Sequence, residues 1–205
     1  MVDLKMLDDI KKEAINDNVP IIEDDSLNFI TDYIVSKGIK KILEIGTAVG
    51  YSSIVMALSS PSVYITTIER DKTRYLKAVE NIKKMNLENR INLIFGDALD
   101  MELDNTFDLI FIDAAKSQSI KFFTKYEKCL DICGTIITDN LSFHGMTNKK
   151  PEEIASRNVR GLVRKINDYK KFLKDNKNYK TKFYDLGDGI SVSERRHVNG
   201  NIGCE

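Results

Sequence analysis

The fold is decided by the stretch Lys40-Lys41-Ile42-Leu43-Glu44-Ile45-Gly46-Thr47-Ala48-Val49-Gly50-Tyr51-Ser52-Ser53. Its apolar half predicts a buried strand, its two glycines predict a turn, and the residues from Tyr51 to about Ser59 predict a helix. A strand that turns into a helix leaves free backbone N–H groups at its carboxyl end, and in an open parallel sheet ligands dock at that end. We therefore expect the ligand site to be built around this turn.

Strands alternate with helices over most of the chain, which is typical of a parallel sheet covered on both faces. Two helices precede the first strand, over 3–16 and from Asp24 or Asp25 to Gly38, and are expected to form a lid or a flank. Strands are predicted at 41–45, 63–68, 91–95, 107–112 and 135–138, and further helices at 50–59, 71–85 and about 117–130.

The pattern changes towards the carboxyl end. A helix is predicted over 157–174, followed by strands at 179–186 and 189–193. Gly187-Asp188-Gly189 is too short for a crossover connection, so these two strands must form an antiparallel hairpin. The sequence thus predicts an α/β fold with a mostly parallel seven-stranded sheet, a C-terminal antiparallel hairpin and helices on both faces. One domain is expected over 1–205, divided into N-terminal helices (1–38), an α/β core (39–194) and a polar tail (195–205), with a mobile loop at 145–156.

Charge is balanced overall and uneven locally. The 205 residues include 31 basic and 31 acidic side chains, so no global field recruits nucleic acid or a membrane. Residues 1–30 hold 8 acidic and 3 basic side chains, a net of −5, whereas residues 144–182 hold 12 basic and 4 acidic ones, a net of +8. Such a basic segment indicates either an anionic partner or a solvated helix face. No apolar run approaches membrane-spanning length, and a cytoplasmic protein without a membrane partner is expected.

The glycine turn itself limits the ligand. Its pattern is Gly46-x-x-x-Gly50, which matches the dinucleotide fingerprint G-x-G-x-x-G poorly and disfavours an NAD-dependent oxidoreductase. Glu44, two positions before the turn, suits a cationic or zwitterionic ligand better than a pyrophosphate. Glu69 ends the second predicted strand, where a carboxylate can accept both ribose hydroxyls of a nucleoside. Asp97, in a turn after the third strand, could approach an adenine amino group or form an ordinary Asx turn.

Polar side chains also follow two neighbouring strands. Asp113 ends the fourth strand, and Asp139 and Asn140 end the fifth. These three residues offer hard oxygen ligands of the kind that Mg²⁺, Mn²⁺ or Ca²⁺ prefers. Lys116, three residues after Asp113, is placed to act as a base. Taken singly, each could be a capping or loop group; their coincidence at two adjacent strand tips favours a metal site.

Five motifs carry a family resemblance: Glu44-Ile45-Gly46-Thr47-x-x-Gly50-Tyr51-Ser52, Glu69-Arg70-Asp71, Gly96-Asp97-Ala98, Ile112-Asp113-Ala114-Ala115-Lys116 and Thr138-Asp139-Asn140. Together they resemble the class I, S-adenosylmethionine-dependent, divalent-metal O-methyltransferases of the catechol and caffeoyl-CoA type. Four further stretches are most similar to the bacterial tRNA 5-hydroxyuridine methyltransferases of that family: Val19-Pro20-Ile21, Thr66-Thr67-Ile68-Glu69-Arg70-Asp71, Ile137-Thr138-Asp139-Asn140-Leu141-x-Phe143-x-Gly145 and Gly187-Asp188-Gly189-Ile190-Ser191-Val192-Ser193.

The resemblance implies a Rossmann-like class I methyltransferase fold, a homodimer and a role for each motif. Asp113, Asp139 and Asn140 would hold the metal, and Lys116 would be the general base. The further carboxylate that grips the second hydroxyl in catechol enzymes has no counterpart that can be placed here. The implied S-adenosylmethionine-binding set is Glu44, Gly46, Thr47, Gly50, Ser52, Glu69, Arg70, Asp97, Ala98 and Asp113.

The resemblance and the basic segment together favour methylation of 5-hydroxyuridine at the tRNA wobble position. The anticodon stem-loop would meet basic residues just after the metal strand. A small-molecule catechol or caffeoyl-CoA-like methyltransferase is the alternative, and a non-catalytic nucleoside- or RNA-binding module is the alternative of another class. The candidate RNA-binding residues are Lys149, Lys150, Arg157, Arg160 and Arg164.

Overall fold

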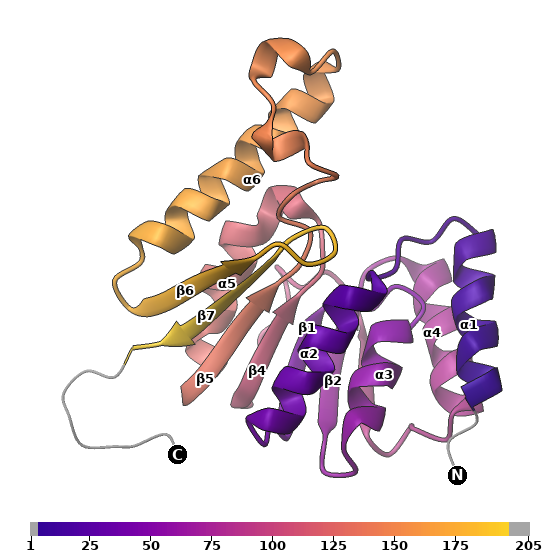
Figure 1. The fold of residues 1–205 in the computed structure, drawn as a ribbon. Coiled ribbons are helices and arrows are strands. Elements are labelled where there is room, and N and C mark those ends of the chain that lie inside the picture. The colour runs from indigo at the N-terminus through magenta and orange to yellow at the C-terminus, as the bar shows by residue number, and fades with distance from the viewer. Residues whose placement is uncertain (1–3, 197–205) are drawn as a thin grey trace.

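The computed structural model describes residues 4–196, which form one seven-stranded sheet between two layers of helices (Figure 1). The strand order is β3-β2-β1-β4-β5-β7-β6, as expected for the Rossmann-like fold predicted from the sequence. The strands are β1 (Lys41–Ile45), β2 (Tyr64–Glu69), β3 (Ile91–Phe95), β4 (Phe107–Ile112), β5 (Leu130–Thr138), β6 (Tyr179–Tyr184) and β7 (Ile190–Arg195).

The terminal hairpin adds the one antiparallel strand. β1 to β5 pair in parallel, whereas β7 runs antiparallel to both of its neighbours, β5 and β6. β7 is therefore inserted between β5 and β6, although β6 comes first along the chain. The register pairs Thr138 with Ser191, which brings the turn before β7 to the carboxyl end of β5.

Two apolar cores lie on opposite faces of the sheet, because successive strand residues point to opposite sides. On one face Ile42 packs with the first four helices; on the other Leu43 and Ile45 pack with the last two. The N-terminal helices are thus a flank. The helices are α1 (Leu4–Asn16), α2 (Asp24–Ser36), α3 (Tyr51–Ser59), α4 (Lys72–Lys84), α5 (Ser119–Tyr126) and α6 (Arg157–Asp175).

Several predicted boundaries change. β5 begins five residues earlier than predicted, and α5 is shorter because 3₁₀ turns precede and follow it. The predicted loop at 145–156 contains two 3₁₀ turns, η3 (Met146–Asn148) and η4 (Pro151–Glu153). β7 includes Arg195, one residue past the predicted core, and the rest of the predicted tail from 197 lies outside the described residues. Among the helices of residues 4–196, none is both long and apolar enough to cross a membrane.

Candidate active site

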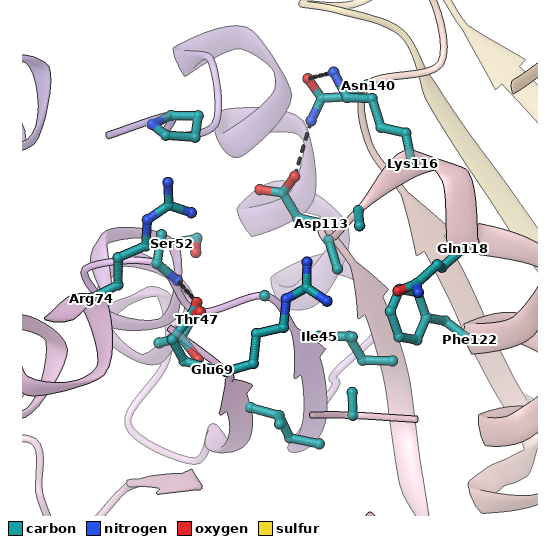
Figure 2. Close-up of a pocket in the computed structure, with 18 of the residues that line it drawn as sticks. Ile45, Thr47, Ser52, Glu69, Arg74, Asp113, Lys116, Gln118, Phe122 and Asn140 are labelled. Carbon is teal, nitrogen blue, oxygen red and sulfur yellow. Dashed lines mark hydrogen bonds between the residues drawn. The ribbon is translucent and has the colours of Figure 1, made fainter. Parts of the chain in front are cut away.

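A cavity of about 540 Å³ opens at the carboxyl ends of β2, β1 and β4, in the range typical of small-molecule sites (Figure 2). Most of the predicted cofactor and metal residues line it, although they come from the carboxyl ends of five strands, β1 to β5, and the segments that follow them. Those that line it are Gly46, Thr47, Ser52, Glu69, Arg70, Asp97, Ala98, Asp113, Lys116 and Asn140.

The turn after β1 is a close approach of two backbone segments. Gly46 has a φ of +101°, and a Cβ at this position would overlap the carbonyl oxygen of Asp113. Gly50 has a φ of +85° and starts α3, but it packs towards Ala78 of α4 and is not among the cavity residues. Gly50 therefore shapes the turn from behind, and its predicted contact with the cofactor stays a prediction.

Replacing Gly46 with alanine is expected to destabilise the fold by about 1–3 kcal/mol, because strain at a positive φ adds to the overlap with Asp113. Gly161 in α6 is a matched control, since a Cβ there meets nothing within 4 Å. Gly161→Ala should instead stabilise by about 0.5–1 kcal/mol through helix propensity. Chemical denaturation of both variants measures the two effects. Equal stability of Gly46→Ala and wild type would contradict the close approach.

Glu44 lies behind the turn. It is fully buried and accepts hydrogen bonds from Ser52 (2.5 Å), Thr67 (2.5 Å) and Ser53. Burial raises the pKa of its carboxyl group, and the three hydroxyl groups partly offset this. Glu44 is not among the cavity residues, and its predicted direct contact with the cofactor stays a prediction. It joins β1, β2 and α3, and it fixes the Ser52 side chain that does line the cavity.

Glu69 is held at the end of β2 with its carboxylate already oriented. Its two oxygens accept the backbone N–H groups of Ala48 and Asp71, each at 2.8 Å. Each carboxylate oxygen keeps a second lone pair for a ligand hydroxyl. Asp97 closes an Asx turn with the backbone N–H of Leu99 (2.9 Å) and pairs with Arg70 at 3.4 Å. These contacts place two acidic groups at one end of the cavity.

The other end joins the tips of β4 and β5 (Figure 2). The Asn140 amide donates hydrogen bonds to Asp113 (2.9 Å) and Asp139 (3.2 Å), and its oxygen accepts one from Lys116 (3.2 Å). Asp139 is 5% exposed and is not among the cavity residues, and it also accepts a hydrogen bond from Ser26 of α2 (3.3 Å). The predicted lysine and both strand tips are thus brought together in one hydrogen-bonded cluster.

The pKa values of the two carboxylates of this cluster, Asp113 and Asp139, are raised. The pKa of Asp113 is raised to about 6, mainly by burial and to a smaller extent by repulsion from Glu44. Burial, followed by repulsion from Asp113, raises the pKa of Asp139 to about 7. Within residues 4–196 no three acidic, histidine or cysteine side chains gather as a metal site, and the predicted metal ligands are two carboxylates and one amide.

Sequence reasoning missed several cavity residues because helix periodicity and apolar segments give no sign of a ligand. Arg74 projects from α4 near Ser52 and forms no ion pair with a described acidic residue (Figure 2). Phe122 of α5 and Phe143 add aromatic surface. The segment between α1 and α2 also reaches the cavity, through Pro20, Ile21 and Ile22.

The basic segment borders the cavity through Leu162 of α6, but the candidate RNA-binding side chains lie away from it. The η3 and η4 turns and the start of α6 project beyond the sheet (Figure 1). Lys149, Lys150, Arg157 and Arg164 are exposed there, and none lines the cavity. Arg160 is used internally: its guanidinium donates to the carbonyl groups of residues 154 and 155, at 2.6 and 2.9 Å. RNA binding by Arg160 stays a prediction, in which only the rest of its guanidinium group would meet a phosphate.

The sheet order and the position of the cavity define a Rossmann-like methyltransferase fold. The model of a family described as O-methyltransferase matches residues 2–196, and the chain belongs to this family.

Three similar proteins illustrate its range. A crystal structure from Staphylococcus aureus with the provisional name caffeoyl-CoA O-methyltransferase is 38% identical, with a TM-score of 0.89, and the match covers 93% of this chain and 92% of that one. The flavonoid 3',5'-methyltransferase of Vitis vinifera is 30% identical over 87% of this chain and 78% of its own length. An O-methyltransferase from Bacillus cereus, solved in complex with SAH (S-adenosylhomocysteine), shares the fold at 24% identity, with a TM-score of 0.81 over 95% of this chain and 92% of that one.

Proposed function

We propose that the protein transfers a methyl group from S-adenosylmethionine to an acidic hydroxyl group, assisted by a divalent cation. The observation that supports this most directly is the single cavity between Glu69 at one end and Asp113, Lys116 and Asn140 at the other (Figure 2). One end suits a nucleoside, and the other suits an oxygen that must lose a proton. Membership of the O-methyltransferase family gives the reaction class.

Each part of the cofactor has a matching group in the cavity. Glu69 would accept the two ribose hydroxyls, because its carboxylate is fixed by two backbone N–H groups. Asp97 and Ala98 would border the adenine. Gly46, Ser52 and Asp113 would surround the methionine part. The SAH-bound structure from Bacillus cereus supports a ligand of this class in the shared fold.

Replacing Glu69 with glutamine is expected to weaken SAH binding about 10- to 100-fold, because charge-assisted hydrogen bonds contribute roughly 1.5–3 kcal/mol. Isothermal titration calorimetry measures the dissociation constant. Glu88→Gln, at an exposed position between α4 and β3, is the charge-matched control and should bind like wild type. Unchanged affinity in Glu69→Gln would exclude Glu69 as the ribose ligand.

The side chains of the candidate metal site are of the types that bind divalent cations. Asp113 and Asp139 are carboxylates whose pKa values are raised mainly by burial, and the Lys116 ammonium group offsets this only in part for Asp113. A half-turn of the Asn140 amide would present its oxygen to the same space as its nitrogen. The set of two carboxylates and one amide fits Mg²⁺, Mn²⁺ or Ca²⁺. When bound, such an ion supplies Lewis acidity that lowers the pKa of an acceptor hydroxyl.

The chain's own residues supply orientation and a route for the proton. Lys116 stands over the Phe143 ring, with its Nζ 4.9 Å from the ring centroid and 3.2 Å from the Asn140 oxygen. From there it can take or orient the acceptor proton at Nζ. The cavity walls hold the methyl donor beside the acceptor, which makes the transfer effectively intramolecular. Phe122 and Phe143 reduce the access of water to the reacting atoms.

The named relatives favour a small phenolic acceptor. The Staphylococcus aureus and Vitis vinifera proteins are named for caffeoyl-CoA and flavonoid methylation, respectively. Both names refer to aromatic hydroxyl groups of small molecules. A vicinal diphenol is therefore the first candidate acceptor for this chain.

The basic segment favours a second candidate, 5-hydroxyuridine at the wobble position of tRNA. Residues 144–182 have 12 basic and 4 acidic side chains, a net of +8. Lys149, Lys150, Arg157 and Arg164 are exposed in this segment and free to meet phosphates. A wobble base lies in a single-stranded loop and can enter a pocket when it is splayed out.

Transfer of a labelled methyl group from S-adenosylmethionine separates the candidates. The acceptors to compare are caffeate, caffeoyl-CoA and tRNA from a strain that lacks this protein, each with and without Mg²⁺. Label in tRNA alone would assign the RNA activity, and label in the phenols alone the small-molecule activity. Absence of label in all acceptors, together with salt-sensitive tRNA binding, would indicate a non-catalytic RNA-binding module instead.

A further inference from the structure

Asp188, in the turn between β6 and β7, is a buried carboxylate beside the candidate active site. It is 4% exposed, and within the described part of the chain its Oδ2 atom has no hydrogen-bond donor. The nearest cation is Lys116, whose Nζ lies 3.6 Å from that oxygen. A buried carboxylate is tolerated only when it is paired. Lys116 therefore provides the charge that Asp188 requires, across 72 positions of sequence.

The rest of Asp188 binds the segment that follows Asn140. Its backbone carbonyl accepts the N–H of Ser142 (2.6 Å), and its Oδ1 accepts the N–H of His144. The carbonyl of Gly189 accepts the N–H of Leu141 (2.9 Å). One turn of the terminal hairpin thus satisfies three backbone donors of the 141–144 segment.

The flanking glycine makes this approach possible. Gly189 has a φ of +86°, and a Cβ there would lie 2.8 Å from the Oγ and 3.0 Å from the backbone nitrogen of Ser142. No side chain fits between the hairpin turn and the 141–144 segment. Asp188 is consequently held at a fixed distance from that segment.

Lys116 is enclosed by three groups that this arrangement brings together. They are the Asn140 oxygen at 3.2 Å, the Phe143 ring at 4.9 Å and the Asp188 carboxylate at 3.6 Å. Asn140 and Phe143 belong to, or border, the segment that Asp188 binds. Loss of the Asp188 charge would remove one contact of the ammonium group directly and loosen the support of the other two.

We propose that Asp188 is a positioning residue of the methyl-transfer site, which holds the Lys116 ammonium group and the 141–144 segment in their working arrangement. This inference rests on the proposed function for the role of Lys116. It adds the terminal hairpin to the active site, whereas the predicted catalytic and metal-binding residues end at Asn140.

The kinetic test compares Asp188→Asn with Asp185→Asn, an exposed carboxylate near the same turn. Asparagine keeps an acceptor for the His144 N–H but removes the charge that faces Lys116. We expect kcat to fall about 10- to 100-fold in Asp188→Asn, with SAH affinity within about threefold of wild type, and no change in Asp185→Asn. Wild-type kcat in Asp188→Asn would overturn the proposal. A parallel loss of SAH affinity and melting temperature would do the same, because it would indicate a purely structural role.

A double-mutant cycle with Lys116→Ala tests whether Asp188 acts through the lysine. In that background Asp188→Asn should cause no further loss of rate. A further loss as large as in wild type would refute the coupling.

If wild type methylates no acceptor, the proposed function fails, and the inference is then tested by a measurement that does not depend on catalytic activity. For that purpose the lysines are reductively dimethylated with ¹³C-formaldehyde and a borohydride reductant, and the Lys116 NMR signal is assigned by its loss in Lys116→Arg. We expect the chemical shift of this signal to change in Asp188→Asn. The Lys125 signal, paired with Glu102 at 2.8 Å, should stay, and an unmoved Lys116 signal would also overturn the proposal.

Discussion

Lys116→Ala is expected to lower kcat for methyl transfer by about 10²- to 10⁴-fold, the range found when a general acid or base is removed. SAH affinity should remain within about threefold of wild type, because a group used only in the transition state contributes little to ground-state binding. Lys121→Ala, at an exposed position of α5, is the matched control. Steady-state kinetics, with the acceptor that the labelled-methyl assay identifies, measure kcat, and calorimetry with SAH measures the affinity.

Lys116→Arg separates the effect of the positive charge at this position from the ability of the side chain to accept a proton. Arginine keeps a cation facing Asp188 but is not deprotonated in proteins, so it cannot take the acceptor proton. We expect this variant to melt near the wild-type temperature and yet to be as slow as Lys116→Ala. Activity close to wild type in Lys116→Arg would contradict a role as base and leave only an electrostatic one.

Asp139→Asn is expected to have two opposite effects: higher stability without metal and a loss of activity of at least about 10²-fold. Burial raises the pKa of Asp139 to about 7 from an ordinary value of 3.8. Between these values the folded chain binds more protons than the unfolded chain, so stability falls as pH rises from about 4 to 7 and is lowest above pH 7. The variant has no carboxyl group to titrate and should lose much of this dependence.

Thermal melting in EDTA between pH 5 and pH 8 measures the stability effect. Wild type should melt at a lower temperature at pH 8 than at pH 5, and Asp139→Asn should lie above wild type at pH 8. Mg²⁺ added at pH 8 should raise the melting temperature of wild type more than that of the variant, because a ligand stabilises the state that binds it. Asp168→Asn, exposed on α6, serves as the control. A wild-type melting temperature that is independent of both pH and Mg²⁺ would contradict the metal site.

The sequence predicted those parts of the site that depend on local pattern and strand order. The turn at Gly46 and the carboxylate at Glu69 follow directly from a strand–turn–helix pattern. The neighbouring positions of Asp113 and Asp139 follow from the parallel order of β4 and β5. The S. aureus structure, with a TM-score of 0.89, agrees with the predicted fold.

The remaining features depend on which side chains meet in three dimensions. The sequence shows Glu44 two positions before the turn, but not that Ser52 and Ser53, in the first turn of α3, donate hydrogen bonds to its buried carboxylate. Arg160 resembles any exposed cation in the sequence, and only the fold brings the carbonyl groups of residues 154 and 155 to it. Asp188 lies between two glycines, a pattern typical of surface turns, so its burial could not be predicted.

The inserted position of β7 has a consequence for how the enzyme matures. During synthesis β5 appears before β6 and β7, and its outer edge stays unpaired until residues 190–195 have been made. An open strand edge of this kind can pair with other chains, and non-local pairing forms slowly. The protein should therefore become able to transfer a methyl group only once β7 has been synthesised and has paired with β5, after the nucleoside end of the cavity has folded. A nascent chain that stops before β7 should bind SAH weakly or not at all at the Asp113 end, and chaperones should meet its uncovered β5 edge.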